Sequence, residues 1–321
     1  MRVPNLLTFL FLTCLTAACG PEPEEPLGLA AMPDQLVAWT AVDSLNQRLP
    51  SSVRVYQGTN DELPLRAWYV SVDLTQETRA RVAVSDDVDL RETVSDFARD
   101  EEACVAVNGG YFRMDADPAS HVGLLMADGE IIEAAIGSVI RDDVRYPTAR
   151  ATLGITDGGR VYIDWVNSRN DSTIAWPAPN PNRPGAPAEF PDLTQANPWP
   201  MRDAVSAGPR LLRDGSPTIT VDEEVFFGSS IPRVHPRTAA GVTAEGALIL
   251  MVVDGRQRDS RGANLTELAQ LLASAGAVDG INLDGGGSSA LVVDGVLLNR
   301  PAGERIQREV MSAILVECPA S

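Results

Sequence analysis

The chain has 321 residues, a hydrophobic fraction of 44% and a formal net charge of −18 at pH 7. Binding of nucleic acid requires a basic face, so this strongly acidic composition excludes nucleic acid as a partner. The length is sufficient for one large domain with a sizeable core, and any anionic ligand must be held by local arginines and N–H groups against an unfavourable overall field.

The first segment has the pattern of an export signal followed by a tether. An apolar run follows Arg2, and the small residues Thr16, Ala17 and Ala18 directly precede Cys19. This pattern predicts a signal peptide over residues 1–18 and lipidation of Cys19, whereas the alternative is ordinary secretion with cleavage nearby. The Pro- and Glu-rich residues 19–35 predict a disordered tether. We therefore expect an outer-membrane lipoprotein of a bacterial cell envelope, facing the periplasm or the exterior and held to the membrane by its lipid.

Residues 36–318 form the predicted folded domain, and its first half alternates strands with tight turns. Hairpins are predicted over 122–132, with its turn at Asp128-Gly129, and over 152–166, with its turn at Asp157-Gly158-Gly159. The run 65–72 alternates in hydrophobicity and is rich in β-forming residues. Residues 93–99 predict a short helix with Val94, Phe97 and Ala98 on one face. A short buried strand at 104–107 then stops at Asn108-Gly109-Gly110, which in isolation is typical of a hairpin turn.

Residues 168–200 form a Pro-rich insertion, for which the sequence predicts no regular structure. Two interpretations are open. One is a variable surface insertion, which is the commoner origin of such loops. The other is a lid in which Trp176 and Trp199 stack on a sugar ring.

The second half predicts a strand, helix and strand unit. Leu248 to Val253 is a continuous apolar run, which favours a strand buried on both faces. A helical stripe over 265–272 and a short strand at 280–283 follow. If the two strands are parallel, Asp254 and Asp284 project from the same edge of a sheet. The fold class predicted from these elements is mixed α/β (α+β), a single domain in which a central multi-stranded sheet carries a few helices.

Glycines follow Asp284 directly, in the run Asp284-Gly285-Gly286-Gly287-Ser288. Successive N–H groups in such a turn form a concavity that suits an anion, although a simple tight turn between strands is equally compatible. No lysine follows the glycines, so this is not the nucleotide-binding P-loop.

Two cysteines, Cys104 and Cys318, lie in the predicted domain. In an exported, oxidising setting they are expected to form a disulfide, and the alternative is two separate buried thiols. No Cys/His spacing predicts a zinc site and no EF-hand spacing is present. No cofactor is expected to be required, although the many aspartates leave a bound Ca²⁺ open.

Five short motifs, taken in order, carry a resemblance to a known family. They are Asn108-Gly109-Gly110-Tyr111-Phe112, Ser206-Ala207-Gly208-Pro209, Pro236-Arg237-Thr238, Asp254-Gly255-Arg256 and Leu283-Asp284-Gly285-Gly286-Gly287-Ser288-Ser289. Each is weak alone, but the ordered set resembles the phosphodiester glycosidase family over about 65–317. The resemblance implies the fold of a sugar-1-phosphodiester hydrolase and does not fix the substrate.

The chemistry of such a reaction assigns expected roles to the motif residues. A carboxylate serves the oxocarbenium-like sugar, and arginines and N–H groups stabilise the leaving phosphate. The expected catalytic residues are Asp284, Asp254 and Asn108, and the expected phosphate- and substrate-binding residues are Arg237, Thr238, Arg256, Gly109, Gly285, Gly286, Gly287 and Ser288. We expect Asp284, Asp254, Arg237, Arg256 and Asn108 to converge on one cleft, with Gly285 to Ser288 as its floor.

The predicted function is an exported glycoside hydrolase that cleaves sugar-1-phosphodiester bonds in envelope or extracellular glycans. One alternative is a non-catalytic polysaccharide-binding or assembly protein of the envelope. Another is a serine hydrolase that uses Ser288 or Ser289 with His235, although the run 286–290 ends in Ala where a nucleophile elbow needs Gly.

Overall fold

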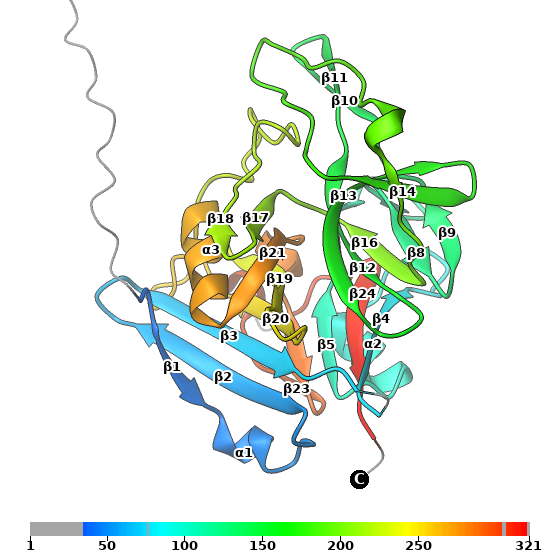
Figure 1. The fold of residues 1–321 in the computed structure, drawn as a ribbon. Helices are drawn as coiled ribbons and strands as arrows, with labels where there is room; N and C mark the ends of the chain where they lie inside the picture. The colour runs from blue at the N-terminus through cyan, green and yellow to red at the C-terminus, as the bar shows by residue number, and fades with distance from the viewer. Residues whose placement is uncertain (1–34, 76, 304–305, 320–321) are drawn as a thin grey trace, which may run out of the picture. The chain divides into compact units, whose positions relative to one another are not determined.

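A computed structural model describes residues 35–75, 77–303 and 306–319. Strands are the predominant regular structure in this part of the chain, and they are arranged in three larger sheets and two short hairpins (Figure 1). The predicted signal peptide, Cys19 and the tether up to residue 34 lie outside the described residues. None of the helices in the described ranges is long and apolar enough to cross a membrane.

The predicted site lies where three inner strands of an eight-stranded sheet begin or end. Every neighbouring pair in it is antiparallel. Its strands in spatial order are β1 (Ala38–Ala41), β2 (Val53–Asn60), β3 (Leu65–Val72), β20 (Leu248–Val253), β19 (Arg237–Thr243), β21 (Ala277–Asn282), β17 (Arg210–Arg213) and β18 (Ser216–Pro217).

A seven-stranded antiparallel sheet is built mainly from hairpins. Its order is β15 (Asn197–Pro198), β14 (Ser172–Trp176), β13 (Val161–Arg169), β12 (Arg150–Ile155), β16 (Asp203–Ser206), β8 (Leu125–Ala127) and β9 (Glu130–Glu133). The predicted hairpins at Asp128-Gly129 and Asp157-Gly158-Gly159 are confirmed, as the β8–β9 and β12–β13 pairs. Separate two-stranded hairpins are formed by β10 (Ser138–Arg141) with β11 (Val144–Pro147) and by β6 (Phe112–Arg113) with β7 (Ser120–His121).

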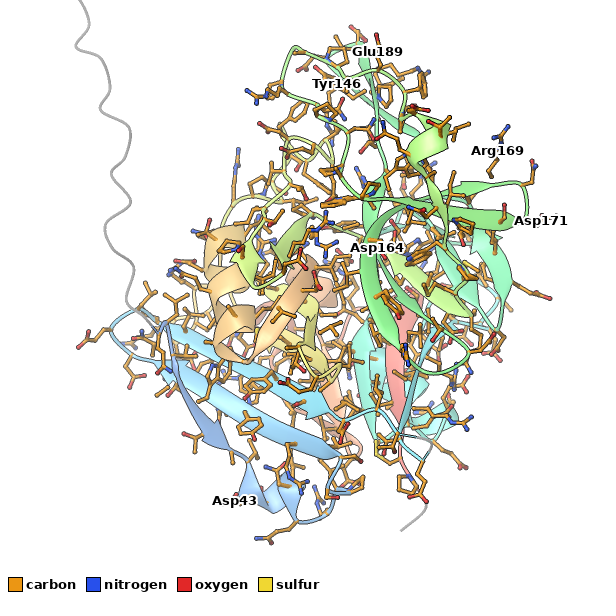
Figure 2. The ribbon with its side chains drawn as sticks, viewed as in Figure 1. Asp43, Tyr146, Asp164, Arg169, Asp171 and Glu189 are labelled. Atoms are coloured by element: carbon orange, nitrogen blue, oxygen red, sulfur yellow. A yellow bond between two sulfur atoms is a disulfide. The ribbon has the colours of Figure 1, made fainter. Side chains whose placement is uncertain are left out.

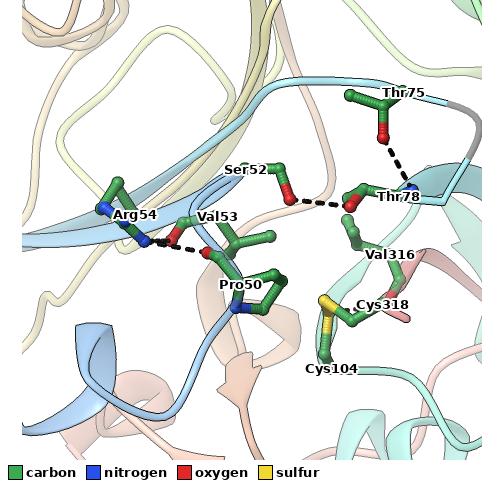
Figure 3. Close-up of a disulfide and its surroundings, with 9 residues drawn as sticks. All are labelled: Pro50, Ser52, Val53, Arg54, Thr75, Thr78, Cys104, Val316 and Cys318. Carbon is green, nitrogen blue, oxygen red and sulfur yellow. Dashed lines mark hydrogen bonds between the residues drawn. A yellow bond between two sulfur atoms is a disulfide. The ribbon is translucent and has the colours of Figure 1, made fainter. Parts of the chain in front are cut away.

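A five-stranded antiparallel sheet holds the disulfide. Its order is β23 (Val296–Leu297), β22 (Leu291–Val293), β5 (Val105–Asn108), β24 (Ser312–Glu317) and β4 (Arg79–Val84). Cys104 precedes β5 and Cys318 follows the adjacent β24, so the two residues meet at one end of the pair. Their Cα atoms are 5.8 Å apart and their sulfurs are bonded (Figure 3), which confirms the predicted disulfide.

The helices are α1 (Asp43–Asn46), α2 (Val94–Asp100) and α3 (Leu265–Ser274), with 3₁₀ turns η1 (Leu193–Gln195), η2 (Gly286–Ser288) and η3 (Pro301–Gly303). Both predicted helices begin with a capping box. The Thr93 side chain caps α2, and the Asn264 side chain accepts the Glu267 N–H at 2.9 Å to cap α3. The apolar stripe of α3 is buried, and each buried leucine contributes roughly 1.5–3 kcal/mol.

The predicted mixed α/β class is wrong, because the described chain is mostly β. Its longest helix, α3, has 10 residues, and strands are divided among several antiparallel sheets rather than gathered in one central sheet. The physical reason is the connections: short Asp-Gly turns return the chain antiparallel, whereas parallel neighbours need long crossovers. One apolar core is shared by all three larger sheets, with Val55, Leu153 and Val107 among its members.

The strand, helix and strand unit exists in an altered form. β20 and β21 are both antiparallel to β19, which lies between them, so β20 and β21 run in the same direction. Their carboxyl ends therefore lie at one edge of the sheet, and Asp254 and Asp284 follow them there. The third segment at this edge is the start of β19, which carries Arg237.

The Pro-rich insertion contains short regular elements, contrary to prediction. It includes β14, η1 and β15, and β14 pairs with β13. Trp176 and Trp199 are 7% and 4% exposed, so neither indole is available as a stacking lid. Packing decides this: Trp199 fills the space above Gly154 and donates to Asp164 Oδ2 at 2.8 Å.

Candidate active site

A cavity of about 160 Å³ opens at the strand edge described above. It is polar and dominated by cationic side chains. Its lining residues are Tyr111, Ser230, Ile231, His235, Pro236, Arg237, Arg256, Leu283, Asp284, Gly285, Gly286, Gly287 and Arg308. Asp284 is the one carboxylate in this set.

Asp284 is fixed by backbone contacts from a distant strand. Its N–H donates to Gly109 O at 3.1 Å, and its carbonyl accepts from Asn108 Nδ2 at 2.7 Å. The carboxylate accepts from Gly285 N–H at 2.9 Å and from the Ser288 hydroxyl. Burial raises the pKa of Asp284 to about 6, against the opposing effect of these hydrogen bonds and of the Arg308 charge. The group is thus mostly ionised at neutral pH and mostly protonated below pH 6.

Arg237 is a buried cation held by carbonyl oxygens. Its Nε donates to Ala263 O at 2.8 Å, its Nη2 donates to Ile231 O at 2.6 Å and to Arg233 O, and its Nη1 lies 3.4 Å from Asn282 Oδ1. Burial lowers the pKa of Arg237 to about 10, so it remains charged at neutral pH. One N–H of Nη1 is left for a ligand in the cavity.

Arg256 and Arg308 lie over the glycine turn that follows Asp284. A Cβ atom on Gly286 would lie 3.4 Å from Arg256 Nη2, and a Cβ on Gly287 would lie 2.5 Å from Arg308 Nη2. A side chain at position 287 would therefore displace the Arg308 guanidinium. Arg256 itself has a φ of +59°, an uncommon conformation for a residue other than glycine and one that recurs at functional sites.

These three arginines have no ion-pair partner among the described residues. Within the described ranges, no carboxylate oxygen lies within 4.0 Å of a guanidinium nitrogen of Arg237, Arg256 or Arg308. The nearby carboxylate of Asp284 acts on Arg308 through its charge alone. A cavity with three unpaired guanidinium groups, in a chain of net charge −18, is suited to a phosphate-containing ligand.

Part of the predicted site converges on this cavity and part lies behind it. Asp284, Arg237, Arg256 and the run Gly285 to Gly287 line the cavity together. Asp254, Asn108, Thr238, Gly109 and Ser288 are absent from the lining. The expectation that all five charged and amide residues of the motifs share one cleft is therefore met only in part.

Asp254 occupies a different environment from Asp284. It is 3% exposed, and its Oδ1 accepts from Arg300 N–H at 2.9 Å and from Asn299 Nδ2 at 3.2 Å. Burial raises the pKa of Asp254 to about 6. The contacts assign Asp254 to holding the segment at Asn299, whose amide in turn donates to Ser289 O at 2.8 Å beneath the glycine turn.

Asn108 and its neighbours form the support of Asp284. Asn108 is fully buried, and its Oδ1 accepts from Thr238 Oγ1 at 2.8 Å and from Ala290 N–H at 3.2 Å. Its amide is thus engaged with protein groups and positions Asp284 rather than facing the cavity. Gly109 permits the close approach of the start of β24, because a Cβ at position 109 would lie 2.4 Å from Ser312 Oγ.

The N–H groups of the glycine turn are used largely within the protein. Gly285 N–H donates to the Asp284 carboxylate, Gly286 N–H to Pro236 O at 2.9 Å, and Ser288 N–H to Gly285 O at 3.2 Å. The turn therefore shapes the cavity floor and leaves anion binding mainly to the arginine side chains. Gly285 is required because a Cβ would lie 2.8 Å from Pro236 O.

Arg308, Tyr111 and His235 also line this cavity, although their positions in the sequence predicted no role in binding a phosphate. Arg308 lies in a connecting segment with no apolar run to mark it. Tyr111 belongs to a quoted motif, and its hydroxyl donates to Gly208 O at 2.8 Å and accepts from Asn282 Nδ2 at 2.7 Å. His235 lies with Nε2 2.9 Å from Ser230 O and Nδ1 3.4 Å from Arg256 Nη2, so it steadies Arg256.

No group of three or more His, Cys, Asp and Glu side chains in the described ranges is arranged to hold a metal ion.

Comparison with known proteins places the motifs and the cavity in one family. The model of the phosphodiester glycosidase family matches residues 101–317. A Mus musculus relative, N-acetylglucosamine-1-phosphodiester alpha-N-acetylglucosaminidase, is 30% identical over 238 residues, which cover 71% of this chain and 40% of the relative. A prophage-derived uncharacterized protein of Bacillus subtilis is 26% identical over 230 residues, covering 71% of this chain and 30% of that protein.

A solved structure shares the fold. The zebrafish N-acetylglucosamine-1-phosphodiester alpha-N-acetylglucosaminidase catalytic domain, described as auto-inhibited by its pro-peptide, superposes with a TM-score of 0.59 at 22% identity and covers 88% of each chain. The chain spans about 40% of the length of the curated mammalian relatives it matches. Because the family model matches most of the chain and includes the residues that line the cavity, from Tyr111 to Arg308, this protein belongs to the phosphodiester glycosidase family.

Proposed function

We propose that this protein hydrolyses sugar-1-phosphodiester bonds, with the cavity around Asp284 as its active site. The observation that carries the proposal is that one carboxylate lines the cavity together with three arginines, none of which has an ion-pair partner in the part of the chain that the structure describes. The protein's membership of the phosphodiester glycosidase family, and the activity for which its vertebrate relatives are named, support the same proposal.

The residues of the cavity fit the two halves of such a reaction. The bond cleaved joins sugar C1 to the bridging oxygen, and positive charge develops at C1 in the transition state. Asp284, ionised above its pKa of about 6, stabilises that charge. The leaving group is a phosphate monoester, which is a weak base and needs charge stabilisation more than protonation. Arg237, Arg256 and Arg308 supply that stabilisation, which agrees with a cavity that holds a single carboxylate.

The cellular context is a further part of the proposal. The Cys104–Cys318 disulfide supports export to an oxidising compartment, and the lipoprotein-like sequence before Cys19 supports attachment to the outer membrane of a bacterial envelope. The substrates are then envelope or extracellular glycans that contain glycosyl phosphodiesters. A Cys19→Ala variant is expected to leave the membrane fraction; a variant that still sediments with membranes contradicts the lipid anchor.

The serine hydrolase alternative finds little support in the geometry. Ser288 is buried, and its hydroxyl interacts with Asp284 and lies 3.4 Å from Arg308 Nη1. His235 is engaged with Ser230 and Arg256. In the described structure no hydrogen bond joins His235 to Ser288 or Ser289, as activation of a serine nucleophile requires.

The direct test is a screen of sugar-1-phosphodiesters, including teichoic-acid-like and capsule-like polymers, followed by mass spectrometry. Hydrolysis in ¹⁸O-labelled water should place the label on the released sugar, because the C1–O bond is cleaved. Label on the released phosphate would identify a phosphodiesterase instead. Tight binding of these compounds without turnover, in a protein whose Asp284→Asn variant binds equally well, would favour the non-catalytic polysaccharide binder.

A further inference from the structure

Arg237 and Arg256 line the same cavity but are held in different ways. Arg237 is 3% exposed, and its guanidinium donates to three backbone carbonyls. Arg256 is exposed, as are the surface side chains of Arg169 and Asp171 at the outer edge of the molecule in Figure 2. An exposed arginine has many rotamers, and the entropy lost on fixing one of them weakens the binding of a ligand. Arg256 is therefore a preorganised ligand for phosphate only if a neighbouring group holds its guanidinium.

The ring of His235, which also lines the cavity, is the group in contact with this guanidinium. His235 Nδ1 lies 3.4 Å from Arg256 Nη2. The guanidinium also packs over the glycine turn, since a Cβ atom on Gly286 would lie 3.4 Å from the same nitrogen. The glycine offers a surface to pack on, whereas the histidine offers an atom that can accept a hydrogen bond. The orientation of Arg256 thus depends on which form of the imidazole faces it.

The carbonyl of Ser230 fixes the tautomer of the His235 ring. His235 Nε2 lies 2.9 Å from Ser230 O, and a carbonyl oxygen can only accept, so Nε2 carries the proton. In the neutral ring, Nδ1 then has a lone pair that accepts from Arg256 Nη2. The other tautomer would place an N–H group against a guanidinium, which has no acceptor. Burial lowers the pKa of His235, and the ring is kept neutral at pH 7 by three nearby arginine charges that lower it further, those of Arg237, Arg256 and Arg233.

The backbone on either side of the ring is also fixed. His235 N–H donates to Ala263 O at 3.2 Å, and His235 O accepts from Ala263 N–H at 2.9 Å. Gly262 permits this close pairing, because a Cβ atom there would lie 2.4 Å from His235 O. The position of the imidazole is therefore set before any ligand enters the cavity.

The loop 230–233 acts on two of the cavity arginines through its carbonyl groups. Two of these carbonyls accept directly from Arg237 Nη2. A third, that of Ser230, acts on Arg256 through the ring of His235. One short loop thus orients one guanidinium directly and a second through a histidine.

We infer that His235 is a positioning residue for phosphate binding, in which the neutral ring with its proton on Nε2 holds the Arg256 guanidinium toward the leaving phosphate. The inference rests on the proposed function for the identity of that phosphate. The role requires an acceptor at the position of Nδ1, which an amide oxygen can also supply.

Two amide variants separate the roles of the two ring nitrogens. His235→Asn places an amide oxygen near the position of Nδ1, whereas His235→Gln places an amide N–H near that of Nε2 and loses the acceptor for Arg256. In calorimetry with inorganic phosphate at pH 7, His235→Asn should bind within about twofold of the parent, and His235→Gln should bind roughly threefold to tenfold more weakly, the scale of one hydrogen bond. Val234→Ala is the matched control, because Val234 is 40% exposed and does not line the cavity. Its phosphate affinity should equal that of the parent, and thermal unfolding checks that all three variants are folded.

A double-mutant cycle distinguishes an effect through Arg256 from a general effect on the cavity. In an Arg256→Gln background, His235→Gln should cause no further loss of phosphate affinity, because the group that His235 holds is gone. Nitrogen-15 NMR of the histidine rings supplies a readout that needs no phosphate. The chain has two histidines, so the signals of His235 are those lost in His235→Asn. At pH 7 they should show a protonated Nε2 and an unprotonated Nδ1.

Each readout has an outcome that overturns the positioning role. These outcomes are a His235→Asn protein that binds phosphate as weakly as His235→Gln, additive losses in the double-mutant cycle, or a proton on Nδ1. If phosphate binding shows the expected coupling but no sugar-1-phosphodiester is hydrolysed, the positioning role stands and the proposed function fails. If substrates are hydrolysed and the coupling is absent, the proposed function stands and the positioning role fails. A parent protein that binds no phosphate contradicts both.

Discussion

Asp254 and Asp284 occupy similar positions in the sheet and have different environments. Each follows a buried strand, β20 or β21, and these strands run in the same direction on either side of β19. Burial raises the pKa of each carboxyl to about 6. Asp284 nevertheless lines the cavity with three arginines, whereas Asp254 bonds to Asn299 and Arg300 N–H.

A position at the end of a buried strand does not by itself make a carboxylate catalytic. What packs against each carboxylate decides the outcome. After Asp284, the backbone of Gly285 and Gly286 packs closely against Pro236 O. The carboxylate of Asp284 therefore remains open to the cavity. The carboxylate of Asp254, by contrast, is covered by the segment at Asn299, whose side-chain amide donates a hydrogen bond to Asp254 Oδ1. A shifted pKa is likewise common to both groups, so it does not separate a functional from a structural carboxylate.

The largest expected difference is in turnover. Asp284→Asn should lower kcat/KM for a sugar-1-phosphodiester by at least about 100-fold, on the scale of general acid–base and electrostatic catalysis. Asp254→Asn should keep most of the activity, because its oxygen can still accept from Arg300 N–H. Thermal unfolding of both variants checks that the fold is intact. Equal losses in the two variants would remove the distinction drawn above.

A second expected effect concerns the leaving phosphate. Arg237→Lys should lower kcat/KM by roughly 10- to 100-fold, because an ammonium cannot reproduce the fork that is held by Ala263 O and Ile231 O. Affinity for inorganic phosphate, measured by calorimetry, should fall in parallel. Arg258→Lys is the control, since Arg258 is two residues from Arg256 in the chain and does not line the cavity. Unchanged phosphate affinity in Arg237→Lys would assign Arg237 to structure alone.

A third expectation is a loss of stability at the structural carboxylate. Asp254→Ala leaves Arg300 N–H and Asn299 Nδ2 without their acceptor, which should lower the free energy of unfolding by about 1–3 kcal/mol. Asp157→Ala, at an exposed hairpin turn, should change it by less than about 0.5 kcal/mol. Denaturant unfolding at pH 7 measures both. A stable Asp254→Ala protein with impaired turnover would reverse the assignments of the two aspartates.

The smallest expected effects are in the pH dependence of activity and of stability, which distinguishes Asp284 from Asp254. Activity should fall as pH drops through about 6, because protonation removes the charge of Asp284. Stability should change in the opposite sense. A folded-state pKa above the unfolded value of about 3.9 means that the folded protein binds the proton more tightly, so each carboxyl lowers stability as pH rises from about 4 to 6. Asp254→Asn should weaken this stability slope and leave the acid limb of activity near pH 6. Movement of that limb in Asp254→Asn would contradict the assignment.

Local patterns in the sequence determined the local elements. The capping residues Thr93 and Asn264, the apolar stripe of α3 and the continuous run of β20 act through neighbours a few residues away, and each predicted element is present. The ordered motifs likewise indicated the family, and the position of the cysteines in the predicted domain indicated the disulfide. The Asp-Gly turns predicted individual hairpins. The sequence did not indicate that these hairpins would combine into several antiparallel sheets, so the predominance of antiparallel pairing was missed.

Tertiary structure alone decided which motif residues face a ligand. Asp254 is buried by a contact 45 positions away, Asn108 is engaged by Thr238 130 positions away, and Arg308 reaches the cavity by packing over Gly287. Such contacts depend on how three sheets share one core, and no periodicity or spacing in the sequence encodes them. The sequence therefore determined which residues gather near the edge of β19, β20 and β21, and long-range packing determined which of them line the cavity and which support it from behind.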